Sequence, residues 1–344
     1  MARFYTRNTA MAFSTIPEAT YNTASTTDSD YTGILIEPVP LVIPQLEKTP
    51  IQGNTEFPEG FCNGYWQPIQ LPFNPPFSFT GLMGRLGLQA LGSSVTTAQQ
   101  GGTAAYKHSA TLATAAALKG RSFAWVNDDI SWLFAGMVVN RYALSQVGGD
   151  LPVCEVEMIG SGKYTNPCPF TVPSATGVCP PTPVTSISIT DDDGTRDLFA
   201  QDVFSWRFEL NNNANPTTLR QGSDTTQGPS GGKGKYVTEI PWTFPRNIGC
   251  TFRVNAEEVT GASGYWEQYA TGEAITSVTI RLEGDTIASS YEYAIDITIA
   301  EGVWASTPVV DNDTILAYDL TLQATNNATP LTFAVTNITT SNYK

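Results

Sequence analysis

Charged residues are scarce in this chain, and the basic ones are the scarcest. Of 344 residues only 15% are charged, and 32 Asp and Glu outnumber 18 Lys and Arg, for a formal net charge of −14. An acidic surface repels phosphate backbones, so the composition excludes a protein that grips DNA or RNA through its charge. The same surplus suits a surface past which DNA slides without sticking. With so few Lys and Glu, much of the surface must be Thr, Ser, Asn, Gln and Gly, as is common where a protein meets copies of itself.

The chain also has little histidine and no clustered cysteine. His108 is the single histidine, so a Ser-His-Asp or Cys-His catalytic device would have to use it. Its strand-like surroundings favour instead an ordinary residue that faces solvent or a neighbour. No C-x-x-C pair of the kind found in zinc sites occurs among the five cysteines, which are Cys62, Cys154, Cys168, Cys179 and Cys250. We expect reduced thiols, with a disulfide between Cys168 and Cys179 as an open alternative.

Signals for membranes, cofactors and metals are missing as well. Pro and polar residues interrupt every apolar run before the ~20 residues of a membrane span, and residues 1–7 lack the apolar stretch of a secretory signal. The loop 228–234 fails the phosphate-loop motif twice, and 191–197 would place Ile189 at the first ligand position of a calcium loop. We predict no cofactor, no metal and no membrane partner. No acid pair stands out for glycan cleavage, which leaves a carbohydrate-active enzyme as a remote alternative.

The distribution of proline and glycine divides the chain into four segments. Residues 1–60 are predicted to be an extended arm, because proline restricts the apolar stretch 34–44 to extended conformations. Six prolines without periodicity between 161 and 184 mark a linker, taken as 166–200. The segments 61–165 and 201–344 are then two β-rich halves, each with strands, one short helix and further strands.

Period-two alternation predicts that the chain is mainly β. In residues 151–159, Cys154, Val156 and Met158 share one face of a strand while Glu155 and Glu157 share the other. Short helices are predicted over 79–91 and 262–269. Further strands are predicted over 64–71, 104–113, 122–127, 132–146, 203–210, 235–244, 275–282, 291–299, 315–323 and 331–335. One wet face per strand indicates a β-sandwich or barrel with a flanking short helix, duplicated in the chain.

Five stretches carry a resemblance to a known family. They are the Tyr-Lys-His stretch of 105–111, the Phe-Ala-Gly-Met-Val-Val-Asn strand of 132–144, the strand ending Ile-Gly in 153–162, the strand 204–212 that leads into a long loop, and the closing strands of 275–337. Together they resemble the tail tube proteins of long-tailed, siphovirus-type bacteriophages over residues 60–338. The Pro-rich arm and linker depart from that family.

The resemblance implies a structural virion protein and not an enzyme. Such subunits close into rings that stack as the hollow tail tube through which phage DNA reaches the host. The implied partners are further copies of the chain, with tape measure and tail terminator proteins beside them, and DNA passes without specific binding. The implied location is the virion tail, assembled in the bacterial cytoplasm. Tail terminator, baseplate hub and injection-system tube proteins are alternatives of the same fold.

The resemblance and the strand pattern also predict the number of chains in a ring, the acids that face the lumen and the contacts between rings. Two tube-type halves per chain favour a trimer with pseudo-sixfold symmetry over a hexamer. Candidate lumen-facing acids are Glu155, Glu157, Glu292, Asp296 and Asp319, each with a solvated exterior position as the alternative. Candidate contacts between rings lie in the arm and in the long loop 211–235; they are Ile34, Leu35, Ile36, Leu41, Val42, Ile43, Gly222, Gly228, Gly231 and Gly232.

Overall fold

A computed structural model describes most of the chain, and the described part is mainly β. It covers residues 9–34, 46–50, 61–66, 69–113, 118, 120–127, 130–173, 183–191, 194–198, 203–214, 220–223, 235–237, 240, 245–255, 264–313, 315–325, 329–340 and 343. Its two main sheets are antiparallel, and they are accompanied by two short α-helices. The prediction of a mainly β fold with a short helix is therefore confirmed.

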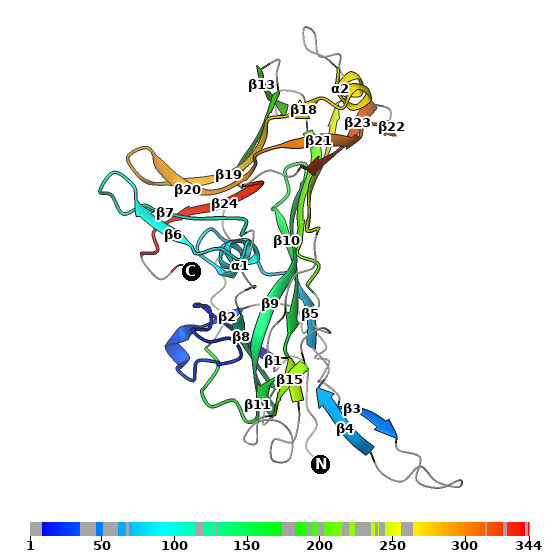
Figure 1. Ribbon diagram of the computed structural model, residues 1–344. Coiled ribbons are helices and arrows are strands. Elements are labelled where there is room, and N and C mark those ends of the chain that lie inside the picture. The colour runs from blue at the N-terminus through cyan, green and yellow to red at the C-terminus, as the bar shows by residue number, and fades with distance from the viewer. Residues whose placement is uncertain are drawn as a thin grey trace.

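The larger sheet, here called the large sheet, has 13 strands and branches at one long strand. That strand, β9 (Ile130–Val147), runs through the centre of the molecule (Figure 1). The first part of β9 pairs with β8 (Arg121–Asn127) and β11 (Tyr164–Thr165), and its last part pairs with β10 (Val153–Gly160) and β14 (Val203–Asn211). The remaining strands are β1 (Thr9–Ser14), β2 (Tyr31–Ile34), β5 (Ile69–Phe73), β17 (Asn247–Asn255), β18 (Ala274–Ile275), β21 (Gly302–Ser306), β22 (Val309–Asn312) and β23 (Ile315–Ala324).

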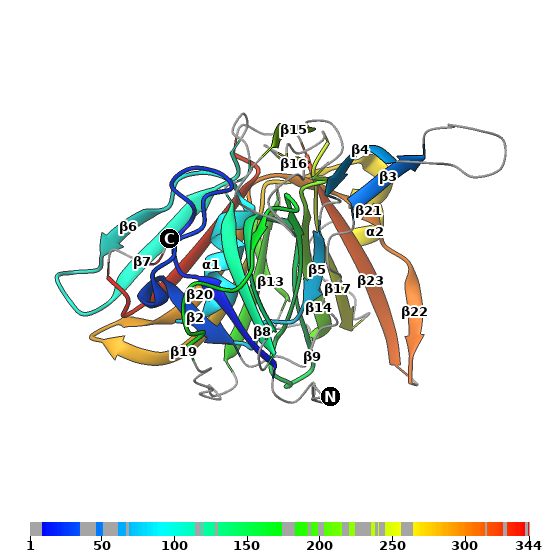
Figure 2. The same cartoon turned by 90° about the horizontal axis from the view of Figure 1, so that it is seen from below.

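The second sheet, here called the seven-stranded sheet, does not branch. Its strand order is β13-β12-β19-β20-β24-β7-β6. The strands are β6 (Thr96–Gln99), β7 (Tyr106–Thr111), β12 (Val184–Asp191), β13 (Gly194–Asp197), β19 (Ser277–Ala288), β20 (Tyr291–Ile299) and β24 (Leu331–Asn337). The hairpins β6–β7 and β19–β20 reach away from the body on the same side (Figures 1 and 2).

A small third sheet and the helices complete the described structure. The third sheet consists of β3 (Leu46–Pro50), β4 (Phe61–Trp66), β15 (Arg220–Ser223) and β16 (Lys235–Val237). The helices are α1 (Leu82–Ala90), which lies inside its predicted window, and α2 (Tyr265–Thr271), which runs two residues past its predicted window of 262–269. A 3-10 turn, η2 (Asp28–Asp30), is also present. Every residue of helix α1 is buried, so the helix is part of the core and does not only cover the flank of the sandwich.

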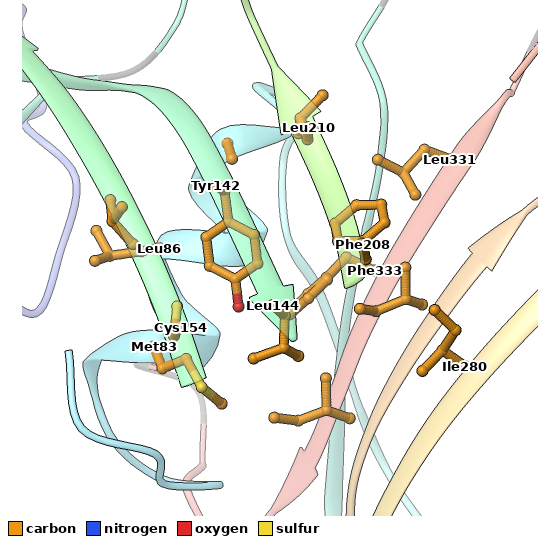
Figure 3. Packing of buried hydrophobic residues seen from close by; sticks show 14 of the residues in the cluster. Met83, Leu86, Tyr142, Leu144, Cys154, Phe208, Leu210, Ile280, Leu331 and Phe333 are labelled. Atoms are coloured by element: carbon orange, nitrogen blue, oxygen red, sulfur yellow. The ribbon is translucent and has the colours of Figure 1, made fainter. Parts of the chain in front are cut away.

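The two main sheets pack face to face around one hydrophobic core. Alternation along each strand supplies the core side, as with Phe208 and Leu210 in β14 and Phe333 in β24, all fully buried. Figure 3 shows these side chains meeting Met83 and Leu86 of α1 between the sheets. Helix α1 packs very close to β24 at Gly87. A Cβ at this position would lie 2.5 Å from the Phe333 ring, so only glycine allows the approach. Strands β10, β12, β14 and β17 therefore keep one apolar face inward and one polar face toward solvent.

The prediction that residues 1–60 form an arm is wrong for residues 9–34. Strand β1 pairs with β8, and Phe13 is fully buried against Phe73 and Phe123. The sequence analysis missed this because Thr, Ser and Asn dominate the segment, and the only apolar run in β1 is the four residues 10–13.

A carboxylate binds the same N-terminal segment to the body. Glu18 accepts hydrogen bonds from the Ser122 hydroxyl (2.9 Å), the Gly136 N–H (2.8 Å) and the Asn22 N–H (2.8 Å). Burial raises the pKa of Glu18, and the three donors oppose that rise. A carboxylate held in this way fixes residues 15–22 against β8 and β9.

We expect Glu18→Ala to lower the free energy of unfolding by about 3 kcal/mol, because two backbone N–H groups lose their acceptor. The exposed Asp28→Ala is the control and should change stability by less than ~0.5 kcal/mol. Urea titration of both variants measures the difference. Equal midpoints would mean that residues 9–34 do not stabilise the fold.

The division into two halves joined by a linker does not match the sheets. Strand β9 of the segment 61–165 pairs with β14 of 201–344, and β7 likewise pairs with β24. Within the predicted linker, β12 is a core strand with Ile187 and Ile189 buried. The order strand, helix, hairpin does occur twice, as β5–α1–β6–β7 and as β17–α2–β19–β20, with the two-residue strand β18 between α2 and β19 in the second series. The halves thus share both sheets and do not form separate sandwiches.

Candidate functional surfaces

The five predicted lumen acids lie on two different surfaces. Glu155 and Glu157 of β10 and Asp319 of β23 point to the solvent side of the large sheet. Glu292 and Asp296 of β20 lie on the solvent side of the seven-stranded sheet. The sheets pack core to core, so these two polar faces point away from each other. One channel cannot be lined by all five acids, so at most one of the two groups lines it, and the other group takes the solvated exterior position.

Ion pairs cover the solvent side of the large sheet, here called the ion-pair face. Arg207 donates to Glu155 at 2.7 Å and bridges to Glu209, which also receives two bonds of 2.8 Å from Arg141. Arg253 holds Asp319 with bonds of 2.6 and 2.8 Å.

The guanidinium groups change the charge state of this face. Hydrogen bonds from Arg207 and Arg141 lower the pKa values of Glu155 and Glu209 respectively, so both stay ionised. The partners are about one-third exposed, and such pairs contribute little to stability. Of the predicted acids on this face, Glu155 and Asp319 are therefore paired with arginines, and Glu157 accepts a hydrogen bond from the Asn140 amide, so the face is not a bare acidic wall. Sequence reasoning missed the arginines because their partners lie 52 and 68 residues away.

Short hydroxyl side chains dominate the solvent side of the seven-stranded sheet, here called the hydroxyl face. One continuous row crosses five strands and contains Ser188, Thr279, Thr298, Thr332 and Thr111. Other hydroxyls flank the row, and they are Ser186, Thr190, Ser109 and Thr96. Alternation of Ser and Thr with Ile and Val in 184–190 and 277–282 was the sequence signal for this face.

The charged groups of the hydroxyl face gather near the β19–β20 hairpin. Arg281 binds Glu283 at 2.7 Å and Asp296 at 2.9 Å, and Lys107 lies 3.5 Å from Asp296. A hydrogen bond between the carboxyl groups of Glu292 and Glu283 raises the pKa of Glu292 and lowers that of Glu283. Three acids against two cations leave this face weakly acidic.

Both ends of the seven-stranded sheet are open edges within the described residues. Strand β6 pairs only with β7, and all four of its residues are exposed. At the other end β13 pairs only with β12, and Gly194 and Thr195 are exposed. Unpaired edges are usually covered or charged, because they invite pairing with another strand. These two edges present backbone donors and acceptors that another copy of the chain can pair with.

Exposed apolar side chains gather where α2 meets β22 and β23. Tyr265 of α2 packs on Trp304 and Tyr318, while the other face of the helix exposes Trp266 (63%) and Tyr269. On the β22–β23 hairpin the exposed apolar residues are Val309, Ile315 and Leu316. Figure 1 shows α2, β22 and β23 together at one end of the molecule. Patches of this kind often mark contacts with another protein.

Most predicted contacts between rings lie outside the described residues. That applies to Leu35, Ile36, Leu41, Val42, Ile43, Gly228, Gly231 and Gly232. Ile34 is the last residue of β2, and Gly222 lies in β15, a strand inside the predicted loop 211–235 that pairs with β16 at the end of that loop. Part of that loop is thus a hairpin of the third sheet.

The residues weighed for chemistry have structural surroundings. His108 is buried and does not face solvent as predicted. Its Nε2 donates to the Thr339 carbonyl at 2.9 Å, its Nδ1 lies 2.9 Å from the Thr97 hydroxyl, and burial lowers its pKa. Cys168 is a free thiol, so the disulfide with Cys179 is not formed. Nowhere in the described ranges do three His, Cys, Asp or Glu side chains gather as a metal site would require.

Comparisons with known proteins add no relative. No protein-family model matches the chain, and no similar protein is found among the curated proteins. Among the residues that the structure describes, no helix is long and apolar enough to cross a membrane.

Proposed function

We propose that this chain is a structural subunit that assembles with copies of itself into stacked rings forming a tube for DNA, as in a phage tail. The observation that supports this most strongly is the unbranched seven-stranded sheet with two open edges. Pairing of β6 from one copy with β13 from the next is a heterologous contact, which closes into a ring when the rotation between copies allows it. Closure removes both edges and makes one continuous barrel.

The strand count supports three copies in each ring. Three copies bring 21 strands, seven from each. With strands ~4.8 Å apart and tilted by ~40°, such a barrel is about 42 Å across between backbones. Side chains of ~5 Å on each wall leave a bore of about 30 Å, which admits a DNA duplex. Six copies would double the diameter and leave DNA loosely held. The two predicted halves contribute to the same sheets, so they no longer support the trimer as two separate sandwiches. The argument for a trimer is the width of the barrel.

The composition and the exposed surfaces agree with the same proposal. A net charge of −14 disfavours adhesion of DNA to the wall. Neutral and apolar exposed patches, such as the end around Trp266 and Leu316, suit contacts between copies. In this proposal the chain has no catalytic role, it resides in the virion tail, and the tape measure and tail terminator proteins are its further partners.

Electron microscopy of the purified protein tests the proposal directly. We expect long hollow tubes after concentration, or after addition of a nucleating tail tip, with three chains in each ring. Isolated rings that never elongate would favour a terminator or hub. A protein that stays monomeric at high concentration in both conditions would contradict the proposal.

A further inference from the structure

The two polar faces differ in whether their sheets can continue into a neighbouring copy. The large sheet branches at β9, whose first part pairs with β8 and β11 and whose last part pairs with β14 and β10. At its other side both β21 and β22 pair with β23, so that border is also divided. A sheet that splits at two places does not extend into a smooth wall. The seven-stranded sheet, in contrast, runs from one open edge to the other without a branch.

The two faces also differ in what they offer to a phosphate. The ion-pair face presents three arginines, Arg141, Arg207 and Arg253, whose side chains are 28–40% exposed. A guanidinium binds phosphate through two parallel hydrogen bonds, so an arginine that exchanges its carboxylate for DNA would hold the duplex. Among the described side chains, the hydroxyl face has one arginine, Arg281, which is bound between two carboxylates, and one lysine, Lys107, which lies 3.5 Å from Asp296.

The hydroxyl row presents a nearly uncharged wall. Within it, the hydroxyl oxygens of the cross-strand neighbours Thr279 and Thr298 lie 3.5 Å apart, and Thr332 is the next residue in the row. Neutral hydroxyls displace no condensed counterions from DNA, so they give no net electrostatic affinity for the backbone. Their short side chains also leave the bore wide. DNA can pass such a surface in either direction without stopping.

We propose, on the basis of the proposed tube, that the hydroxyl face of the seven-stranded sheet is the wall that faces duplex DNA. The ion-pair face lies on the tube exterior. The row Ser188, Thr279, Thr298, Thr332 and Thr111 then recurs three times around each ring. Of the predicted lumen acids, Glu292 and Asp296 lie inside, and Glu155, Glu157 and Asp319 lie outside.

Paired lysine substitutions distinguish the two faces. Thr298→Lys/Thr332→Lys changes two directly opposed threonines of the hydroxyl face, and Thr251→Lys/Thr321→Lys changes an equivalent pair of the ion-pair face. Tubes of each variant are incubated with short duplex DNA and then with nuclease. We expect nuclease-protected DNA only in the first variant. Its six lysines per ring should make retention fall by on the order of 10³-fold between ~50 and ~200 mM salt. Protected DNA in the second variant, or in neither, overturns the assignment.

Cysteine probes test the same assignment with smaller changes, in case lysines hinder folding. In tubes of Thr251→Cys we expect reaction with a maleimide on a polymer too wide for the bore. Thr298→Cys should react only with a small maleimide, once the background from native cysteines is subtracted. Equal or reversed labelling overturns the face assignment while leaving the tube intact. Failure of the native protein to form tubes would instead overturn the proposed function.

Discussion

Replacing Gln99 with proline is expected to abolish ring formation while the monomer stays folded. Gln99 lies in the edge strand β6, and the neighbouring Gln100 N–H donates to the Ala105 carbonyl. Because bonded and non-bonded pairs alternate in an antiparallel hairpin, the Gln99 N–H points to the open edge. Proline there removes an edge donor and obstructs an incoming strand, but it breaks no bond to β7.

The expected loss of assembly is large because each ring repeats the defect. If one interface loses on the order of 2 kcal/mol, three interfaces lose ~6 kcal/mol, or roughly 10⁴-fold in the assembly equilibrium. Sedimentation velocity over a concentration series measures it. Gln99→Ala is the matched control, since it removes the side-chain bond to the Thr103 carbonyl and keeps the backbone donor. Tubes of normal length from the proline variant would show that β6 is not a ring contact.

The contact between α1 and β24 should give the largest change in monomer stability. Phe333 is fully buried, stacks edge-on against Tyr142 at 5.7 Å, and fills the space beside Gly87. Phe333→Ala should cost about 3–5 kcal/mol in the free energy of unfolding. Gly87→Ala alone should lower the free energy of unfolding by about 1–3 kcal/mol, because the added Cβ would overlap the Phe333 ring, which has no room to move away.

The double variant tests the contact directly, because the effect of Gly87→Ala on the free energy of unfolding should change sign when Phe333 is also replaced. Once Phe333 is alanine, the Cβ at position 87 meets no ring, and alanine is favoured over glycine in a helix by up to ~1 kcal/mol. Gly87→Ala should therefore be neutral or stabilising in the Phe333→Ala background. Denaturant unfolding of the four proteins gives a coupling of about 2 kcal/mol or more. Additive effects would mean that α1 does not rest on Phe333.

Element types could be predicted where the sequence has a clear period. The helix window 79–91 contains α1, and the window 262–269 covers all but the last two residues of α2. The alternating stretches 151–159, 203–210 and 291–299 are strands of the predicted kind. Strands β12 and β17 alternate equally well, with Ile187 and Ile189 or Cys250 and Phe252 inward. They were missed because proline lies just before both strands, at Pro183 before β12 and at Pro241 and Pro245 before β17, so composition outweighed periodicity.

The sequence by itself determined which face of each strand meets water, because side chains alternate strictly along a strand. It therefore identified Glu155, Glu157, Glu292, Asp296 and Asp319 as solvent-facing. Only the tertiary structure decided that these acids belong to two opposite faces, because strand order depends on pairings such as β9 with β14 and β24 with β7. The arginine partners were likewise decided there, since Arg207 reaches Glu155 only after distant strands have become neighbours. Alternation is a local property of the chain, whereas sheet order and charge pairing depend on contacts between residues far apart in sequence.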